Sequence, residues 1–99
     1  MIKHVVMLGL PEGYETAELA VVMAGLKSLN IPGFQGFEHG PNIDLERKTQ
    51  NYPYGFVCTF ADQTALETYA SDPHHQTLGG RLVALCQGAE NIMVMDLVV

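Results

Sequence analysis

The chain has 99 residues, of which 47% are hydrophobic, and a formal net charge of −6. This length fits one compact domain over residues 1–99, and the acidic balance, which repels phosphate, disfavours nucleic acid as a partner. No apolar run approaches the roughly 20 residues of a membrane helix, so we expect no membrane partner and a cytoplasmic location.

The first half of the chain predicts a strand, a helix and a second strand. Residues 2–10 are rich in β-branched and apolar side chains and end at the Pro-Glu-Gly turn of residues 11–13. Between residues 15 and 29 apolar side chains recur at three- and four-residue steps, which is the spacing of one helical face. The Asn-Ile-Pro-Gly sequence at 30–33 ends this helix, and residues 34–39 form a short strand.

A polar loop and a third strand follow. Residues 40–53 are mostly polar and predict a long loop, whereas residues 54–60 are rich in strand-forming side chains. Asp62 is well placed to cap a second helix whose buried face includes Tyr69.

The Ser-Asp-Pro sequence at 71–73 breaks that helix. Pro73 suits the first turn of a new helix with Asp72 as its cap, and this helix is expected to continue to Gly88. Residues 90–99 are predicted to form the last strand.

This order of elements predicts an α+β, ferredoxin-like βαββαβ fold with both helical segments on one face of a four-stranded antiparallel sheet. The first and last strands are apolar on both faces, as in the first strand, where Val6 and Leu8 are opposed by Val5 and Met7. Helices cover only one face. A second copy of the same sheet is the simplest cover for the other, so we predict a homodimer through the sheet face.

Several short patterns, in their order and spacing, resemble the stress-responsive A/B barrel (Dabb) family over essentially the whole chain. They are Lys3-His4, Ile31-Pro32-Gly33, Gly40-x-Asn42, Tyr54-Gly55-Phe56-Val57, Thr59-Phe60, Ala65-Leu66-x-x-Tyr69, Asp72-Pro73-His74-His75 and Asp96. The resemblance implies a dimeric α+β barrel. A plant polyketide cyclase of this family implies a site that corresponds to His4, Tyr69 and His75. The chain differs from that cyclase at Asp72 and Tyr54, where the cyclase has histidines.

The residues themselves allow proton-transfer chemistry at these three positions. Tyr69 and His75 flank the break at Pro73, so both side chains can turn toward the same sheet face. His75 as general base, Tyr69 as hydrogen-bond donor to an enolate oxygen and His4 as orienting group would then suit enolisation of a carbonyl compound. The alternative is that His4 and Tyr69 are core residues and that His75 faces solvent.

Three further residues are predicted to contact a substrate. Tyr54 and Phe34 are expected to line a pocket between the sheet and the helices, and Arg47 to close over an anionic group. An ordinary solvated loop is the alternative for Arg47. Asp44 and Glu46 suggest a cation site in this loop, but they lack the ligand spacing of a calcium motif. A solvated loop is the alternative for them as well.

The cysteines and the remaining motifs predict no metal and no cofactor. Cys58 and Cys86 form no CxxC or Cys/His ligand spacing and are expected to be buried free thiols. No phosphate-binding loop or nucleophile elbow is present. The function predicted is a cofactor-free cyclase, lyase or isomerase that acts on a small hydrophobic or carbonyl, polyketide-like compound. The alternative is a non-catalytic, stress-associated dimer that binds a ligand.

Overall fold

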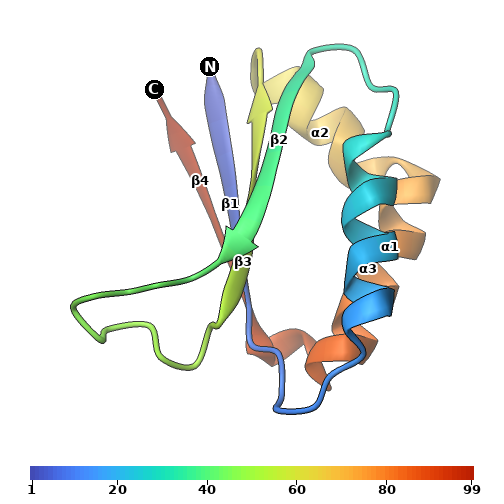
Figure 1. Ribbon diagram of the computed structural model, residues 1–99. Helices are drawn as coiled ribbons and strands as arrows, with labels where there is room; N and C mark the ends of the chain where they lie inside the picture. The colour runs from blue at the N-terminus through green and yellow to red at the C-terminus, as the bar shows by residue number, and fades with distance from the viewer.

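Four strands and three helices form the computed structural model, which describes residues 1–99 (Figure 1). In chain order the elements are β1 (Ile2–Leu8), α1 (Thr16–Lys27), β2 (Phe34–Pro41), β3 (Tyr54–Phe60), α2 (Gln63–Ser71), α3 (Pro73–Cys86), a 3₁₀ turn (Ala89–Asn91) and β4 (Ile92–Val98). No helix is both long and apolar enough to cross a bilayer.

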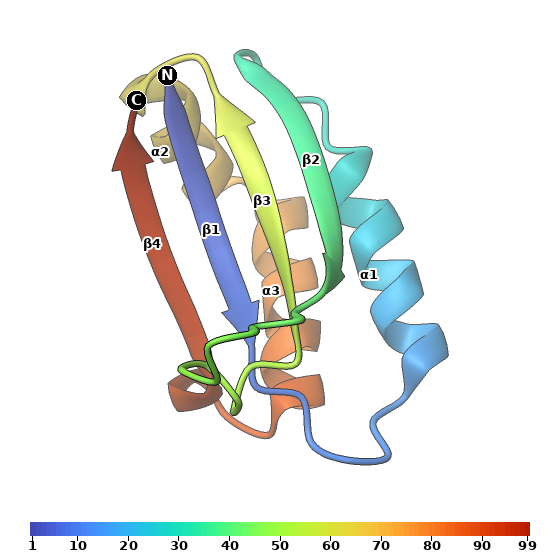
Figure 2. The ribbon, with the colours of Figure 1, turned by 60° about the vertical axis from the view of Figure 1, so that its left-hand side comes forward.

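The strands form one antiparallel sheet in the order β2-β3-β1-β4. All three helices lie on the same side of this sheet, which leaves its other side open (Figures 1 and 2). The predicted α+β, ferredoxin-like βαββαβ fold is therefore confirmed. The chain begins in the centre of the sheet, and β4 and β2 are its two edges.

The hydrophobic core lies between the sheet and the helices. The two-residue period of a strand places alternate β1 and β3 side chains on this face, and α1 covers them with four buried apolar residues. Burial of each large apolar side chain contributes about 1.5–3 kcal/mol, so this layer dominates the stability of the fold. The strand and helix residues of the core include Ile2, Val6, Leu8, Phe56, Cys58, Phe60, Leu19, Val22, Met23 and Leu26.

The open face of the sheet is also apolar. Val5 on β1 is the register partner of Val57 on β3 and of Met95 on β4, and Leu97 follows on the same face. Met95 and Leu97 are exposed in the single chain, because no helix reaches them. We call this surface the open face below.

Two aspartates fix the starts of the last two helices, as predicted. Asp62 accepts a hydrogen bond from the backbone N of Ala65 at 2.9 Å, and Asp72 accepts one from the backbone N of His75 at 2.9 Å. Pro73 occupies the first turn of α3. This helix ends at Cys86 rather than at the expected Gly88, because Gln87 adopts a left-handed conformation with φ of 61°.

Candidate functional site

A cavity of about 380 Å³ lies between the sheet and α3, beside the edge strand β4. Its walls are mainly apolar, and the exposed residues Val83 and Val94 border it, so it opens to solvent between α3 and β4. His4, Tyr69 and His75 all line it. The apolar walls include Val6, Phe56, Leu82, Val83, Ile92 and Val94.

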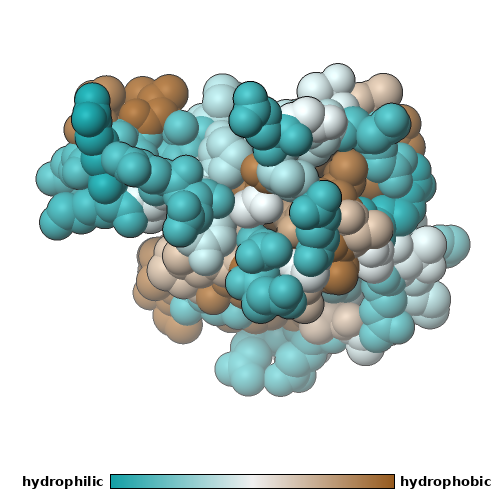
Figure 3. Space-filling view, turned by 90° about the horizontal axis from the view of Figure 1, so that it is seen from below, coloured by the Kyte–Doolittle hydropathy of each residue, from teal (hydrophilic) through white to brown (hydrophobic).

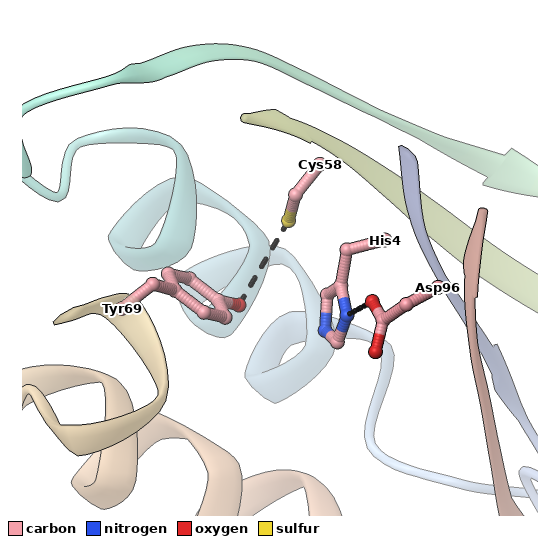
Figure 4. Close-up of polar contacts among 4 residues, drawn as sticks. All are labelled: His4, Cys58, Tyr69 and Asp96. Atoms are coloured by element: carbon pink, nitrogen blue, oxygen red, sulfur yellow. Dashed lines mark hydrogen bonds and ion pairs between the residues drawn. The ribbon is translucent and has the colours of Figure 1, made fainter. Parts of the chain in front are cut away.

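His4 reaches the cavity from β1. Its Nδ1 lies 2.6 Å from Oδ1 of Asp96, its register partner on β4. Because an ionised carboxylate only accepts hydrogen bonds, this contact makes Nδ1 of His4 the donor and turns the other ring nitrogen, Nε2, away from Asp96. Figure 4 shows the His4 ring between Asp96 and Tyr69. Asp96 thus fixes both the orientation and the tautomer of His4.

Tyr69 comes from α2 and is only 1% exposed. The Cys58 thiol donates to its hydroxyl oxygen at 3.8 Å, a contact that does not use the phenolic proton (Figure 4). Burial first, and then the neighbouring Cys58, raise the pKa of Tyr69. The phenol therefore stays protonated at neutral pH and keeps one hydrogen to donate.

His75 lies in the first turn of α3, where the Asp72 cap fixes its backbone. Its ring packs on Tyr69 with ring centroids 3.9 Å apart. Its Nδ1 is buried and has no hydrogen-bond partner of ordinary geometry. Burial lowers the pKa of His75, the Ala70 carbonyl opposes that shift, and His4 adds to it. The ring is therefore neutral at pH 7 with a polar atom unsatisfied, which is uncommon in a folded protein.

The three predicted substrate contacts lie elsewhere. Tyr54 bonds through its hydroxyl to Nδ1 of His39 at 2.6 Å, and Phe34 stacks on Phe60 with centroids 5.2 Å apart. Arg47 belongs to the loop between β2 and β3, which leaves the sheet on the side away from the helices (Figure 1). None of the three lines the cavity. Phe34 lies on β2, the sheet edge opposite β4, and Tyr54 is the first residue of β3, next to the loop that carries Arg47.

Sequence reasoning missed two partners of the site. Cys58 was expected only as a buried thiol, and Asp96 only as part of a family pattern. Asp96 contacts His4 across the β1–β4 strand pair, and Cys58 on β3 contacts Tyr69 of α2. Asp96 carried a usable signal, because it is the only charged residue of β4. Both cysteines are buried and unpaired, and burial raises the pKa of Cys58 to about 11.

The acidic loop residues serve the loop itself. The Asp44 carboxylate accepts hydrogen bonds from the backbone N of Glu46 and Lys48 and from Thr49. No group of three or more His, Cys, Asp or Glu side chains is arranged to hold a metal ion. His74 points into a different hollow, of about 470 Å³, with Gly25 and Asn30.

The fold and the cavity define a class of protein: a ferredoxin-like α+β domain with histidine and tyrosine side chains around a cavity between sheet and helices. The chain belongs to the Dabb family, because the sequence profile of the stress responsive A/B barrel domain matches residues 2–99. Among curated proteins, none matches the sequence at a significant level.

Solved structures show the same fold. A dimeric ferredoxin-like protein of unknown function from Jannaschia sp. is 46% identical over 99% of this chain and 98% of its own, with a TM-score of 0.91. A Dabb family protein from Mesorhizobium loti is 27% identical over 99% and 95%, with a TM-score of 0.74. A hydroxynitrile lyase from Passiflora edulis covers 99% and 92% with a TM-score of 0.81, but its 14% identity shows the fold alone.

Proposed function

We propose that this protein is a cofactor-free enzyme that moves a proton at the carbon beside a carbonyl group, as a cyclase, lyase or isomerase of a small apolar, polyketide-like compound. The observation that carries the proposal is the meeting of His4, Tyr69 and His75 at one apolar cavity that opens to solvent. An apolar cavity with a few convergent polar groups is the usual form of a small-molecule site.

The proposed step is enolisation. A nitrogen of the neutral His75 ring takes the proton from the carbon beside the carbonyl. The C–H electron pair forms the new C=C bond, and the C=O π pair moves to the carbonyl oxygen. The Tyr69 hydroxyl donates a hydrogen bond to the oxygen as it becomes negative. The Asp96–His4 pair holds a second imidazole against the substrate and orients it.

We also propose that two copies pair through their open faces. Val5, Met95 and Leu97 would then lie in the interface, and burial of this face would stabilise the pair. The Jannaschia protein, which is dimeric and matches nearly the whole chain, supports the formation of a dimer.

The second candidate function is that of a dimeric protein that binds a ligand without catalysis. The near-complete burial of Tyr69 favours this alternative, because a packed tyrosine can serve the core alone. Ligand binding at the cavity without proton exchange would identify it.

The test combines NMR titration of the four histidines with deuterium exchange at the central carbon of a β-dicarbonyl compound. His75→Ala should lower the exchange rate by roughly 10²- to 10⁴-fold, the usual contribution of a general base. His74→Ala is the matched control, because His74 is the neighbouring residue but borders another hollow. Equal rates in the wild type and His75→Ala would end the general-base proposal.

Tyr69→Phe separates the donor from the packing role. The ring and its contacts remain, whereas the hydroxyl is lost, so the rate should fall by roughly 10²- to 10³-fold while the fold survives. An unchanged rate in a folded Tyr69→Phe variant would leave the ligand-binding alternative.

A further inference from the structure

The loop between β2 and β3 carries two apolar side chains into solvent. It spans residues 42–53 and leaves the sheet on the side of the open face, opposite the helices (Figures 1 and 2). Ile43 is 77% exposed and Leu45 is 87% exposed, the highest value among the large apolar residues of the chain. Seen from below, the loop is a mostly hydrophilic lobe with an apolar patch on it (Figure 3).

This loop has a fixed shape in the single chain. The Asp44 carboxylate accepts hydrogen bonds from the backbone N of Lys48 at 2.6 Å and from the Thr49 hydroxyl at 2.7 Å. The Asn42 amide donates to Thr49 Oγ1 at 2.9 Å and to the Tyr52 carbonyl at 2.8 Å. The hydrogen bonds to the Asp44 carboxylate, those from Thr49 first, lower the pKa of Asp44. A loop that is already ordered loses little conformational entropy when it binds a partner.

The position of the loop relates its exposed side chains to the open face. Sheets that pack face to face lie about 10 Å apart. A second sheet packed on the open face would therefore contact the loop of residues 42–53, which projects from the sheet on that side. The open face itself continues the apolar surface, since Met95 and Leu97 are exposed.

We infer that residues 42–53 are a dimerisation arm whose Ile43 and Leu45 side chains pack against a second copy of this chain. The inference rests on the homodimer through the open face proposed above and adds a second set of contacts to it. In a twofold dimer each arm contact occurs twice, so two residues supply four buried side chains. The net charge of −6 argues against an anionic membrane as the occupant.

The test measures the dimer dissociation constant by sedimentation equilibrium in three variants. Ile43→Ser with Leu45→Ser removes the apolar part of the arm and spares the Asp44 and Asn42 hydrogen bonds. Leu97→Asp places a charge on the open face. Val21→Ser is the control, because Val21 is an exposed apolar residue on α1, on the other side of the molecule.

We expect the arm variant to raise the dissociation constant by at least about tenfold, Leu97→Asp to give monomers, and Val21→Ser to match the wild type. If the arm variant has the same dissociation constant as Val21→Ser while Leu97→Asp is monomeric, the loop does not contribute to the dimer, but the dimer through the open face stands. A wild type that is monomeric, or a dimer that survives Leu97→Asp, would overturn both. Circular dichroism confirms that each variant is folded.

A second measurement does not depend on a variant. In a dimer mixed from ¹³C-labelled and unlabelled chains, isotope-filtered NOE spectra report contacts between copies only. The Ile43 methyl groups should show NOEs to protons of the unlabelled copy. Their absence in a sample that is dimeric would contradict the inference.

Discussion

Both faces of the sheet carry large apolar side chains, yet the helices bury only one of them. Leu8 on the helix-covered face is fully buried, whereas Leu97 on the open face is 53% exposed. Sequence hydrophobicity therefore does not decide burial in this fold; the position of the helices does. The covered face contributes most of the stability and forms one wall of the cavity. The open face leaves large apolar side chains exposed in the single chain.

Replacement of one leucine on each face should give the largest difference. Leu8→Ala should lower the free energy of unfolding by about 2–5 kcal/mol at any protein concentration, because it leaves a cavity in the core. Leu97→Ala should cost less than about 1 kcal/mol in dilute solution and more as the concentration rises, since only the dimer buries it. Urea denaturation at several concentrations measures both. If both variants lost the same free energy of unfolding at every protein concentration, the two faces would not differ in burial.

The next prediction concerns how tightly the helix-covered side is packed. Gly33 has φ of 84°, and a Cβ there would lie 2.7 Å from Cβ of Ala65. Gly33→Ala should therefore cost more than about 2 kcal/mol through strain and overpacking. Gly80→Ala is the matched control on α3, where a Cβ would meet nothing, and should stabilise the helix by about 0.5–1 kcal/mol. Thermal unfolding of both variants would show opposite shifts.

The buried His75 makes the covered side sensitive to pH. Its pKa is lowered below 6.5 in the folded protein, mainly by burial, so the unfolded chain binds a proton more readily. The free energy of unfolding should consequently fall as the pH drops below about 6.5 toward the lowered pKa. His75→Gln should flatten this dependence, whereas His74→Gln should keep it. Urea titrations between about pH 5 and pH 7.5 measure the slopes.

The smallest effect is expected on the outer surface of the helices. Arg81 donates to both carboxylate oxygens of Glu18 at 2.5 and 2.8 Å, which joins α1 to α3 and lowers the pKa of Glu18. Both side chains are partly exposed, so solvent and salt screen the pair. Glu18→Gln should lower the melting temperature slightly at low salt and leave it unchanged at high salt. A large loss at high salt would show that the helices depend on this pair.

The order and type of the elements could be predicted because each carries a local signal. A run of β-branched and apolar side chains marks β1, three- and four-residue apolar steps mark α1, and Asp62 and Asp72 mark the helix starts. Element ends were less predictable. The last strand begins at Ile92 rather than at residue 90, because a 3₁₀ turn at Ala89–Asn91 precedes it.

The site was partly predictable for a similar reason. The break at Pro73 is local and brings Tyr69 and His75 together, and the family resemblance adds His4. Phe34 could not be placed from the sequence, because its position depends on β2 becoming the sheet edge opposite β4. The contact of Tyr54 with His39 is likewise set by the pairing of β2 with β3, and the loop that carries Arg47 has no periodic pattern that fixes its direction. Strand register, another long-range property, determines that Asp96 meets His4.

The His4–Asp96 pair also has a consequence for how the sheet assembles. Apart from Asp96, β4 is entirely apolar, so a shift by one residue would exchange one apolar face for another and cost little in hydrophobic burial. Such a slip would, however, leave His4 opposite Met95 or Leu97 and the Asp96 carboxylate without its partner. One polar pair thus favours a single register of β4. Natural selection that keeps His4 and Asp96 for the site therefore also keeps this strand in its correct register.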